Sequence, residues 1–460
     1  MRTWTAAVAM LLLVGCDTAV TNPGLTPDQQ LDQPAAWPAV VVGARRSLSD
    51  AIGSSAGPVS QLLYWGAAMT FEINPAGSTG SYGIPTDVQA GLPTDATMNG
   101  DWTQSNVARY TAEAAVARFR RVMPDTVFPK SPLVAQAYLY AGFANRLLGE
   151  NFCQSVIPVE VPNPTHYVLA PGSLGSHTLY FLRADTAFTN AIAVFTATGK
   201  TDTLTVNFIL AARAGRASVR ADLASYGLGP WSDATADAAL VPSGFVFQAP
   251  YAAASPDQYN YLYWARANQS FRAHTEWGTF YEDYYRRTRD LRVRWDTTTK
   301  SDTLGDAAVA KFGGRVPFWP EAKYTTTSAP VRLSSGWEMR LIAAEAALVS
   351  GDAATAVDSM NRRRANLSLP LYDRTVSVDS AWSLLKLERA LELWLEARRL
   401  GDLRRWVTNN TPGAYVDGTY RAAHPGTLSP TPIETMTAPV ARALCFPVGR
   451  NERETNPNVP

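Results

Sequence analysis

The segment 336–367, GWEMRLIAAEAALVSGDAATAVDSMNRRRANL, constrains the fold of this chain more than any other stretch. Apolar and small residues recur in its first half at the spacing of one helix face, and Gly351 suits the left-handed position that follows a helix. Asp352 is a suitable N-cap for a second helix. Because the residues expected to face each other are mostly alanines, two antiparallel helices can pack closely. The segment therefore predicts a helical hairpin of the tetratricopeptide type.

Related patterns occur in other parts of the chain, without a strict repeat. Similar units fit residues 131–152 and 206–229, and a further long helix fits Leu174–Ala197. These segments predict a mainly α-helical fold built from degenerate helical hairpins.

The strongest single helix is expected over residues 378–406, VDSAWSLLKLERALELWLEARRLGDLRRW. Asp379 is expected as its N-cap and Gly401 as its end, before a short turn. Three acidic residues lie four apart on one side and would repel one another if left alone: Glu388, Glu392 and Glu396. We expect arginines of the preceding hairpin, Arg362–Arg364, to neutralise them in a structural role.

Two long segments have loop character, residues 74–102 and residues 241–335. They are rich in Gly, Pro, Asn and aromatic residues. Loops of this length inside a compact domain are usually functional or mobile. We therefore expect any ligand to bind on these segments.

The N-terminus has the features of a bacterial secretion signal that keeps a cysteine. Residues 1–15 combine a basic residue, an apolar run and a small residue before the cut, and Leu13–Cys16 resembles a lipobox. This resemblance implies lipidation of Cys16, cleavage before it and anchoring to a membrane. Residues 16–36 are rich in Asp, Thr, Pro and Gln, which predicts a flexible tether.

Composition excludes several classes of function. The chain has 460 residues, 46% of them hydrophobic, and its 41 basic and 40 acidic residues leave a net charge of +1. No general basic field is therefore available to bind nucleic acid. The four histidines are scattered and show no paired Cys/His spacing, so neither a catalytic metal site nor a cofactor is expected. Cys153 and Cys445 could form a disulfide outside the cytoplasm or remain two buried thiols.

The C-terminal third carries three ordered motifs that resemble those of the SusD/RagB family. They are an alanine-rich hairpin broken by Gly-Asp, then E-R-x-x-E-L-x-x-E-x-x-R followed by D-L-x-R-W, and a final P-x-x-x-x-E-x-x-x-N-P. In this chain the second and third motifs fall on Glu388, Arg389, Glu392, Leu393, Glu396, Arg399, Asp402, Leu403, Arg405, Trp406, Pro447, Glu452, Asn456 and Pro457.

The resemblance implies a fold and a role. It implies about four tetratricopeptide-like hairpins and an irregular, loop-rich subdomain, within one SusD-like domain over residues 37–460. The expected parts are N-terminal hairpins over 37–240, a ligand-facing segment over 241–335 and C-terminal hairpins over 336–460. The implied function is a non-enzymatic, lipid-anchored protein of the outer membrane. It would capture an oligosaccharide or another nutrient and pass it to a SusC-like TonB-dependent transporter.

Candidate ligand residues come from the chemistry of sugars, whose rings present apolar faces edged by hydroxyl groups. Their sites combine aromatic planes with polar side chains. The loop-rich segments offer two such mixtures, and the candidates are Tyr82, Asn99, Trp102, Gln104, Trp277, Tyr281, Trp319 and Tyr324. Plain packing in the core is the alternative for every aromatic residue. It applies especially to Tyr281, Tyr284 and Tyr285, which have helical spacing.

Two other functions stay open at this point. A surface glycan hydrolase would need two carboxylates in one cleft, and Glu276 and Glu282 are the pair to consider. A helical scaffold that binds only proteins would need no ligand site at all.

Overall fold

The computed structural model describes residues 28–54, 61–76, 83–163, 168–267, 272–296, 318–415 and 442–460. Cys16 lies outside these residues. Within them the fold is mainly α-helical, which confirms the predicted class. None of their helices is both long and apolar enough to cross a bilayer.

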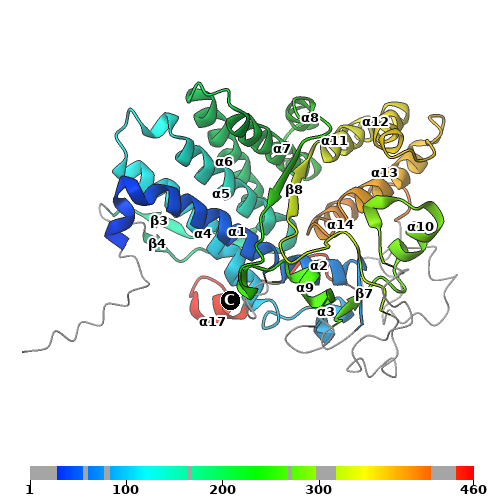
Figure 1. Ribbon diagram of the computed structural model, residues 1–460, viewed down its shortest axis with the longest axis horizontal. Coiled ribbons are helices and arrows are strands. Elements are labelled where there is room, and N and C mark those ends of the chain that lie inside the picture. The colour runs from blue at the N-terminus through cyan, green and yellow to red at the C-terminus, as the bar shows by residue number, and fades with distance from the viewer. Residues whose placement is uncertain are drawn as a thin grey trace, which may run out of the picture.

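Long helices form an arc of packed neighbours, which occupies the upper part of the molecule in Figure 1. Most consecutive helices pack on one another, as expected for helical hairpins. The helices of the arc are α1 (Trp37–Gly53), α4 (Asn99–Val122), α5 (Pro132–Asn151), α6 (Thr178–Ala197), α7 (Thr203–Ser225), α8 (Trp231–Ala239), α11 (Gly336–Val349), α12 (Ala353–Asn366), α13 (Val378–Glu392) and α14 (Arg399–Thr408).

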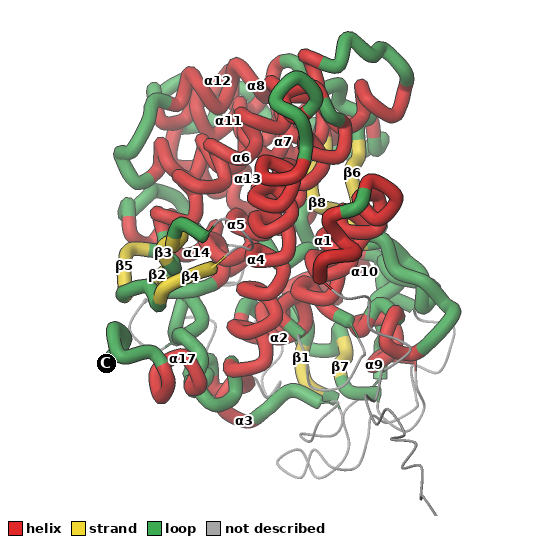
Figure 2. The backbone as a smooth tube through the Cα atoms, turned by 90° about the vertical axis from the view of Figure 1, so that its left-hand side faces the viewer, coloured by secondary structure: helices red, strands yellow, loops and turns green. Residues whose placement is uncertain are grey.

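An irregular part lies below the arc, as Figures 1 and 2 both show. Its helices are α2 (Leu62–Met69), α3 (Thr86–Ala90), α9 (Tyr261–Ala267), α10 (Phe280–Thr288) and α17 (Arg450–Thr455). Four antiparallel pairs of short strands complete the described chain: β1 (Asn74–Pro75) with β7 (His274–Thr275), β2 (Gln154–Val156) with β5 (Leu174–Ser176), β3 (Val159–Val161) with β4 (Val168–Ala170), and β6 (Val246–Ala249) with β8 (Val331–Ser335).

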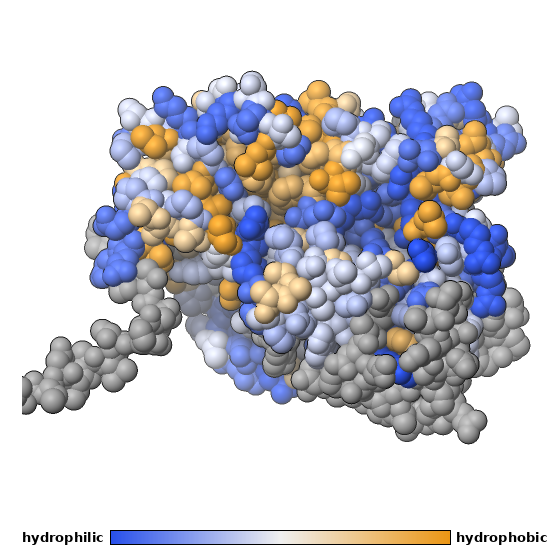
Figure 3. All heavy atoms as spheres, in the orientation of Figure 1, coloured by the Kyte–Doolittle hydropathy of each residue, from blue (hydrophilic) through white to orange (hydrophobic). Residues whose placement is uncertain are grey.

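The hairpin of α11 and α12 is formed as the sequence predicts. Gly351 has φ +83°, and the Asp352 side chain accepts a hydrogen bond from the Thr355 amide as the N-cap of α12. Leu341, Val357 and residues of α13 and α14 share a second hydrophobic core beside the main one. Apolar and hydrophilic side chains are interspersed on the surface of the arc (Figure 3).

The predicted helix over residues 378–406 is wrong in its boundaries. Ser377, and not Asp379, is the N-cap; α13 ends at Glu392, and Gly401 lies inside α14. Two non-glycine residues between the helices, Leu395 and Ala397, have positive φ.

Contacts from distant segments explain this break. The Leu395 amide donates to Glu72 Oε1 at 2.8 Å, and the Tyr324 hydroxyl donates to the Leu395 carbonyl at 2.7 Å. These bonds satisfy backbone groups that a continuous helix would have paired internally. Tertiary contacts therefore override the local helical pattern.

The three glutamates of this region form a buried ion-pair network. Arg364 contacts Glu388 at 2.7 Å and Arg363 contacts Glu392 at 2.8 Å, which confirms two of the three predicted arginines. The loop-rich segment supplies further partners that the sequence did not indicate: Arg292 for Glu388, Arg332 for Glu392 and Glu396, and Lys323 for Glu396.

Two N-terminal boundaries also differ from expectation. Residues 28–36, predicted as part of the tether, form two short 3₁₀ turns, and Asp32 pairs with Arg118 and Arg121 of α4. The helix expected from Leu174 begins only at Thr178, because Leu174–Ser176 pair with β2 as strand β5.

Cys153 and Cys445 form a disulfide, with Cα atoms 5.0 Å apart. The Phe446 amide also donates to the Asn151 carbonyl at 2.7 Å, and the Cys153 amide donates to the Phe446 carbonyl at 2.9 Å. The C-terminal segment is thereby fixed to the end of α5, and the alternative of two free thiols is excluded.

Candidate functional site

The candidate residues of the first loop lie at the start of α4, and Trp102 there is part of the core. Its ring is 2% exposed, contacts the Phe152 ring edge-on at 5.1 Å and donates from Nε1 to Glu452 at 3.2 Å. Trp102 therefore exposes almost none of its ring for a sugar to stack on. Asn99 and Gln104 are half-buried, and their ligand-binding role stays a prediction. Tyr82 lies outside the described residues.

Two candidates of the second loop are also packed in the core. Tyr281 is 1% exposed and stacks on Trp394 with centroids 5.5 Å apart. Tyr324 is 2% exposed and binds the Leu395 carbonyl through its hydroxyl. For these two residues the alternative of plain packing fits the structure better than ligand binding.

Trp277 and Trp319 are the remaining aromatic candidates, and both are half-buried in the irregular part. Hydrogen bonds of the adjoining backbone hold their loops together: the Glu276 amide donates to the Trp319 carbonyl at 2.8 Å. Trp319 stacks on Trp295 with centroids 5.1 Å apart and planes 16° apart. The Arg286 guanidinium carbon lies 5.7 Å from the Trp295 centroid and 5.3 Å from that of Trp319.

These distances place Arg286 beside the two stacked rings, because a cation over the outer face of one ring would lie much farther from the other. The Arg286 side chain is 51% exposed and pairs with the buried Glu282. We call Trp277, Trp319 and Arg286 the tryptophan site; Trp295, which is buried, supports Trp319 from behind. It combines indole rings with a solvent-accessible cation, which is the composition expected of a sugar-binding surface.

The carboxylates considered for hydrolysis do not form a catalytic pair. Glu276 is fully buried, and burial together with the neighbouring Glu321 raises its pKa well above the ordinary value. Glu282 is 2% exposed and is occupied by the Gly278 amide and by Arg286. A glycosidase needs both carboxyl groups at the scissile bond. Neither of these two groups reaches a cleft in the part of the chain that the structure describes.

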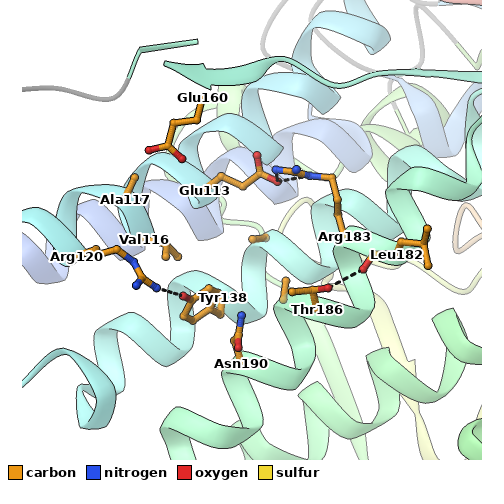
Figure 4. A pocket seen from close by; sticks show the side chains of 12 residues that line it. Glu113, Val116, Ala117, Arg120, Tyr138, Glu160, Leu182, Arg183, Thr186 and Asn190 are labelled. Atoms are coloured by element: carbon orange, nitrogen blue, oxygen red, sulfur yellow. Dashed lines mark hydrogen bonds and ion pairs between the residues drawn. The ribbon is translucent and has the colours of Figure 1, made fainter. Parts of the chain in front are cut away.

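A pocket of about 470 Å³ lies on the opposite side of the molecule, among α4, α5, α6 and β3. Figure 4 shows Arg120 and Arg183 on opposite sides of it, with Tyr138 and Asn190 between them. Its apolar lining is Val116, Ala117, Ala141, Leu182 and Ala187. We call it the α4–α6 pocket. Its volume is within the usual range for small-molecule sites.

The sequence reasoning missed this pocket, although a signal was present. Arg183, Thr186, Ala187 and Asn190 recur at helical spacing on one face of α6, between the apolar residues of its core face. A polar stripe of this kind usually faces solvent. Only the packing of α6 against α4 and α5 turns it into the wall of a cavity.

Nothing among the described residues suggests a metal centre, because no three His, Cys, Asp or Glu side chains are grouped there as ligands. Residues 321–459 match the model of the SusD family. No curated protein matches the chain.

Solved structures with the same fold cover nearly the whole chain. A SusD homologue from Bacteroides thetaiotaomicron VPI-5482 has a TM-score of 0.64 at 14% identity and covers 95% of this chain and 98% of its own. A SusD superfamily protein from Parabacteroides distasonis ATCC 8503 has a TM-score of 0.63 at 15% identity, with 93% and 98% covered. A SusD-like carbohydrate-binding protein from Bacteroides vulgatus ATCC 8482 has a TM-score of 0.56 at 15% identity, with 81% and 83% covered.

At such low identities these likenesses establish the fold alone. The family motifs lie in the matched region, where Arg389 binds Asp402 and Asp402 in turn binds Arg405. They hold α13 against α14 and are part of the scaffold. The chain is therefore similar to the SusD family over residues 321–459 and shares the fold of SusD superfamily structures over nearly its whole length.

Proposed function

We propose that this protein binds a glycan or oligosaccharide at the outer membrane and passes it to a SusC-like TonB-dependent transporter. The observation that carries the proposal is the SusD family match over residues 321–459, supported by the shared fold. One protein of this fold, from Bacteroides vulgatus, is described as carbohydrate-binding.

The tryptophan site is the surface we assign to the glycan. Indole rings stack on the apolar faces of sugars, and a guanidinium group can donate to their hydroxyl groups. The outward position of Arg286 beside the rings supports this assignment.

The protein acts without catalysis in this proposal. The buried Glu276 and the ion-paired Glu282 support binding over hydrolysis, since neither is placed to protonate or attack a glycosidic bond. Lipid on Cys16 would anchor the protein, with the chain up to Pro27 as the tether.

Isothermal titration of the full-length chain with glycans chosen from an array tests the binding. Trp319→Ala should weaken the affinity about tenfold, the scale of one stacking contact. Trp231→Ala is the matched control, because this half-buried tryptophan lies on α8, outside the tryptophan site. Equal affinity in both variants would remove Trp319 from the site.

The same preparation distinguishes the other functions. Release of shorter oligosaccharides from the bound glycan would favour a hydrolase. Failure of every glycan to bind, with capture of proteins alone, would favour a scaffold. For the anchor, Cys16→Ala should release the protein from the outer-membrane fraction and should reduce its co-purification with a large β-barrel.

A further inference from the structure

The α4–α6 pocket contains a cation, Arg120, that has no acidic partner among the described residues. The Arg120 guanidinium forms no ion pair with any residue that the structure describes. Its Nη2 donates to the Tyr138 hydroxyl at 3.2 Å, and its carbon lies 4.8 Å from the centroid of Phe128. These two contacts hold the guanidinium at the pocket wall before any ligand arrives. A ligand would therefore not need to order this side chain on binding.

Most of the other charge in the pocket is already neutralised. Glu113 pairs with Arg109 at 2.8 Å and with Arg183 at 2.9 Å, and it accepts from Asn145 at 3.0 Å. Burial alone would raise the pKa of Glu113, but these partners outweigh it and lower the pKa. Glu113 is therefore an ionised structural group and does not compete for Arg120.

The groups that remain around Arg120 are mainly donors. The Tyr138 oxygen accepts from Arg120, so its own O–H is available to donate. The Asn190 side-chain amide lies in the pocket and makes no hydrogen bond with the described residues. Guanidinium, phenol and amide donors on one cavity wall suit an anion, and the planar fork of arginine suits a carboxylate in particular.

The charge balance of the pocket disfavours more than one negative charge on the ligand. Its four charged lining residues are Arg120, Arg183, Glu113 and Glu160, two positive and two negative, so their sum is zero. A phosphate dianion would meet two carboxylates there. The apolar floor of Val116, Ala117, Ala141 and Ala187 in turn suits a ligand body with an apolar face.

We propose that the α4–α6 pocket is a second ligand site, which takes a small molecule with one carboxylate on a body that has an apolar face. The carboxylate binds Arg120 and Tyr138, and the body lies over the small residues of α4, α5 and α6. This site is separate from the tryptophan site and does not depend on the function proposed above. Two sources offer this chemistry, sugar acids and the C-terminal carboxylates of short peptides.

Titration calorimetry of the full-length chain tests the proposal with matched probes. Galacturonate, with one carboxylate, is compared with neutral galactose, and an acetylated dipeptide with its C-terminal amide. We expect one carboxylate to bind at least about tenfold more tightly than its neutral counterpart, as for a hydrogen bond to a charged group. The arm that binds identifies the source. Binding of a neutral probe as tight as that of its acid would overturn the proposal, and so would no binding of either acid at about 10 mM.

Variants assign the binding to Arg120. Arg120→Gln should weaken the carboxylate about tenfold or more, and Tyr138→Phe should weaken it less. Arg287→Gln is the matched control and should change nothing, because this arginine of α10 has a 58% exposed side chain and lies outside the pocket. Full affinity in Arg120→Gln, with an unchanged circular dichroism spectrum, would refute the site even if a glycan still binds through Trp319.

Discussion

The Phe188 side chain of α6 shows how closely three helices of the arc approach one another. It is fully buried between Gly142 of α5 and Gly215 of α7. A Cβ atom added to Gly142 would lie 2.6–2.8 Å from atoms of the Phe188 ring, and one added to Gly215 would lie 2.4–3.0 Å from it. Carbon atoms prefer separations of about 3.5–4.0 Å. The two glycines are therefore required by packing.

Replacement of Gly142 by alanine should reveal this requirement. In a helix interior, Gly→Ala normally gains about 1 kcal/mol of stability. At Gly142 the added methyl overpacks the core, which costs about 1–3 kcal/mol. The net change should run from no gain to a loss of about 2 kcal/mol. Gly43 of α1 is the matched control, because a Cβ atom there would meet nothing within 4 Å and only the gain should appear.

Urea unfolding followed by circular dichroism measures both variants. The difference in their free energies of unfolding cancels the helix propensity and leaves the overpacking term. Phe188→Leu removes the ring, so Gly142→Ala in that background should no longer destabilise. Equal stabilisation by Gly43→Ala and Gly142→Ala would refute the reasoning, as would a loss that persists after Phe188→Leu.

Three further predictions concern stability. Replacing Cys153 and Cys445 by serine removes a disulfide between residues 292 apart in sequence, and the free energy of unfolding should fall by up to about 5 kcal/mol. The urea midpoint of the variant should be lower than that of the natural chain and should no longer change when a reductant is added. Burial raises the pKa of Glu72 to about 7, so the folded state keeps a proton that the unfolded state releases above about pH 4.5. The free energy of unfolding should therefore fall as the pH rises from about 4.5 to about 7. Glu72→Gln should flatten this pH dependence, measured through the melting temperature. Glu392→Ala takes from Arg363 its carboxylate partner and from Arg332 and Arg292 one of theirs, and should cost up to about 3–5 kcal/mol, whereas Asp283→Ala, from a more exposed pair, should cost less than about 1. Similar thermal shifts for both variants would contradict the network.

The helical hairpin over residues 336–367 could be predicted because its determinants are local. Gly351 ends one helix and Asp352 caps the next, and both act within a few residues of themselves. The alanines on the facing sides of the two helices allow close packing whatever lies elsewhere in the chain. The same applies to the core faces of α5 and α7.

The end of α13 could not be predicted, because its cause is not local. The helical pattern continues through Leu395, but Glu72 and Tyr324 bind the backbone there from two distant loops. The periodicity of a sequence indicates which residues favour a helix, but it gives no information about partners from distant segments. The same limit explains why Arg332 was missed as a partner of Glu392.

Ligand-binding residues were the hardest to predict from the sequence. An aromatic residue in a polar loop can stack on a ligand or pack in the protein's own core, and its sequence surroundings do not distinguish the two. Trp102 and Trp319 have similar sequence surroundings, yet Phe152 and Glu452 enclose the first, while the second remains half-buried beside Arg286. The difference lies in which segments return to cover each ring. Arg120 shows the converse, since a residue that looks like an ordinary exposed helix cation becomes a pocket donor once α6 closes the opposite wall. In this fold the helices set the scaffold locally, whereas long-range packing decides which side chains are left to bind.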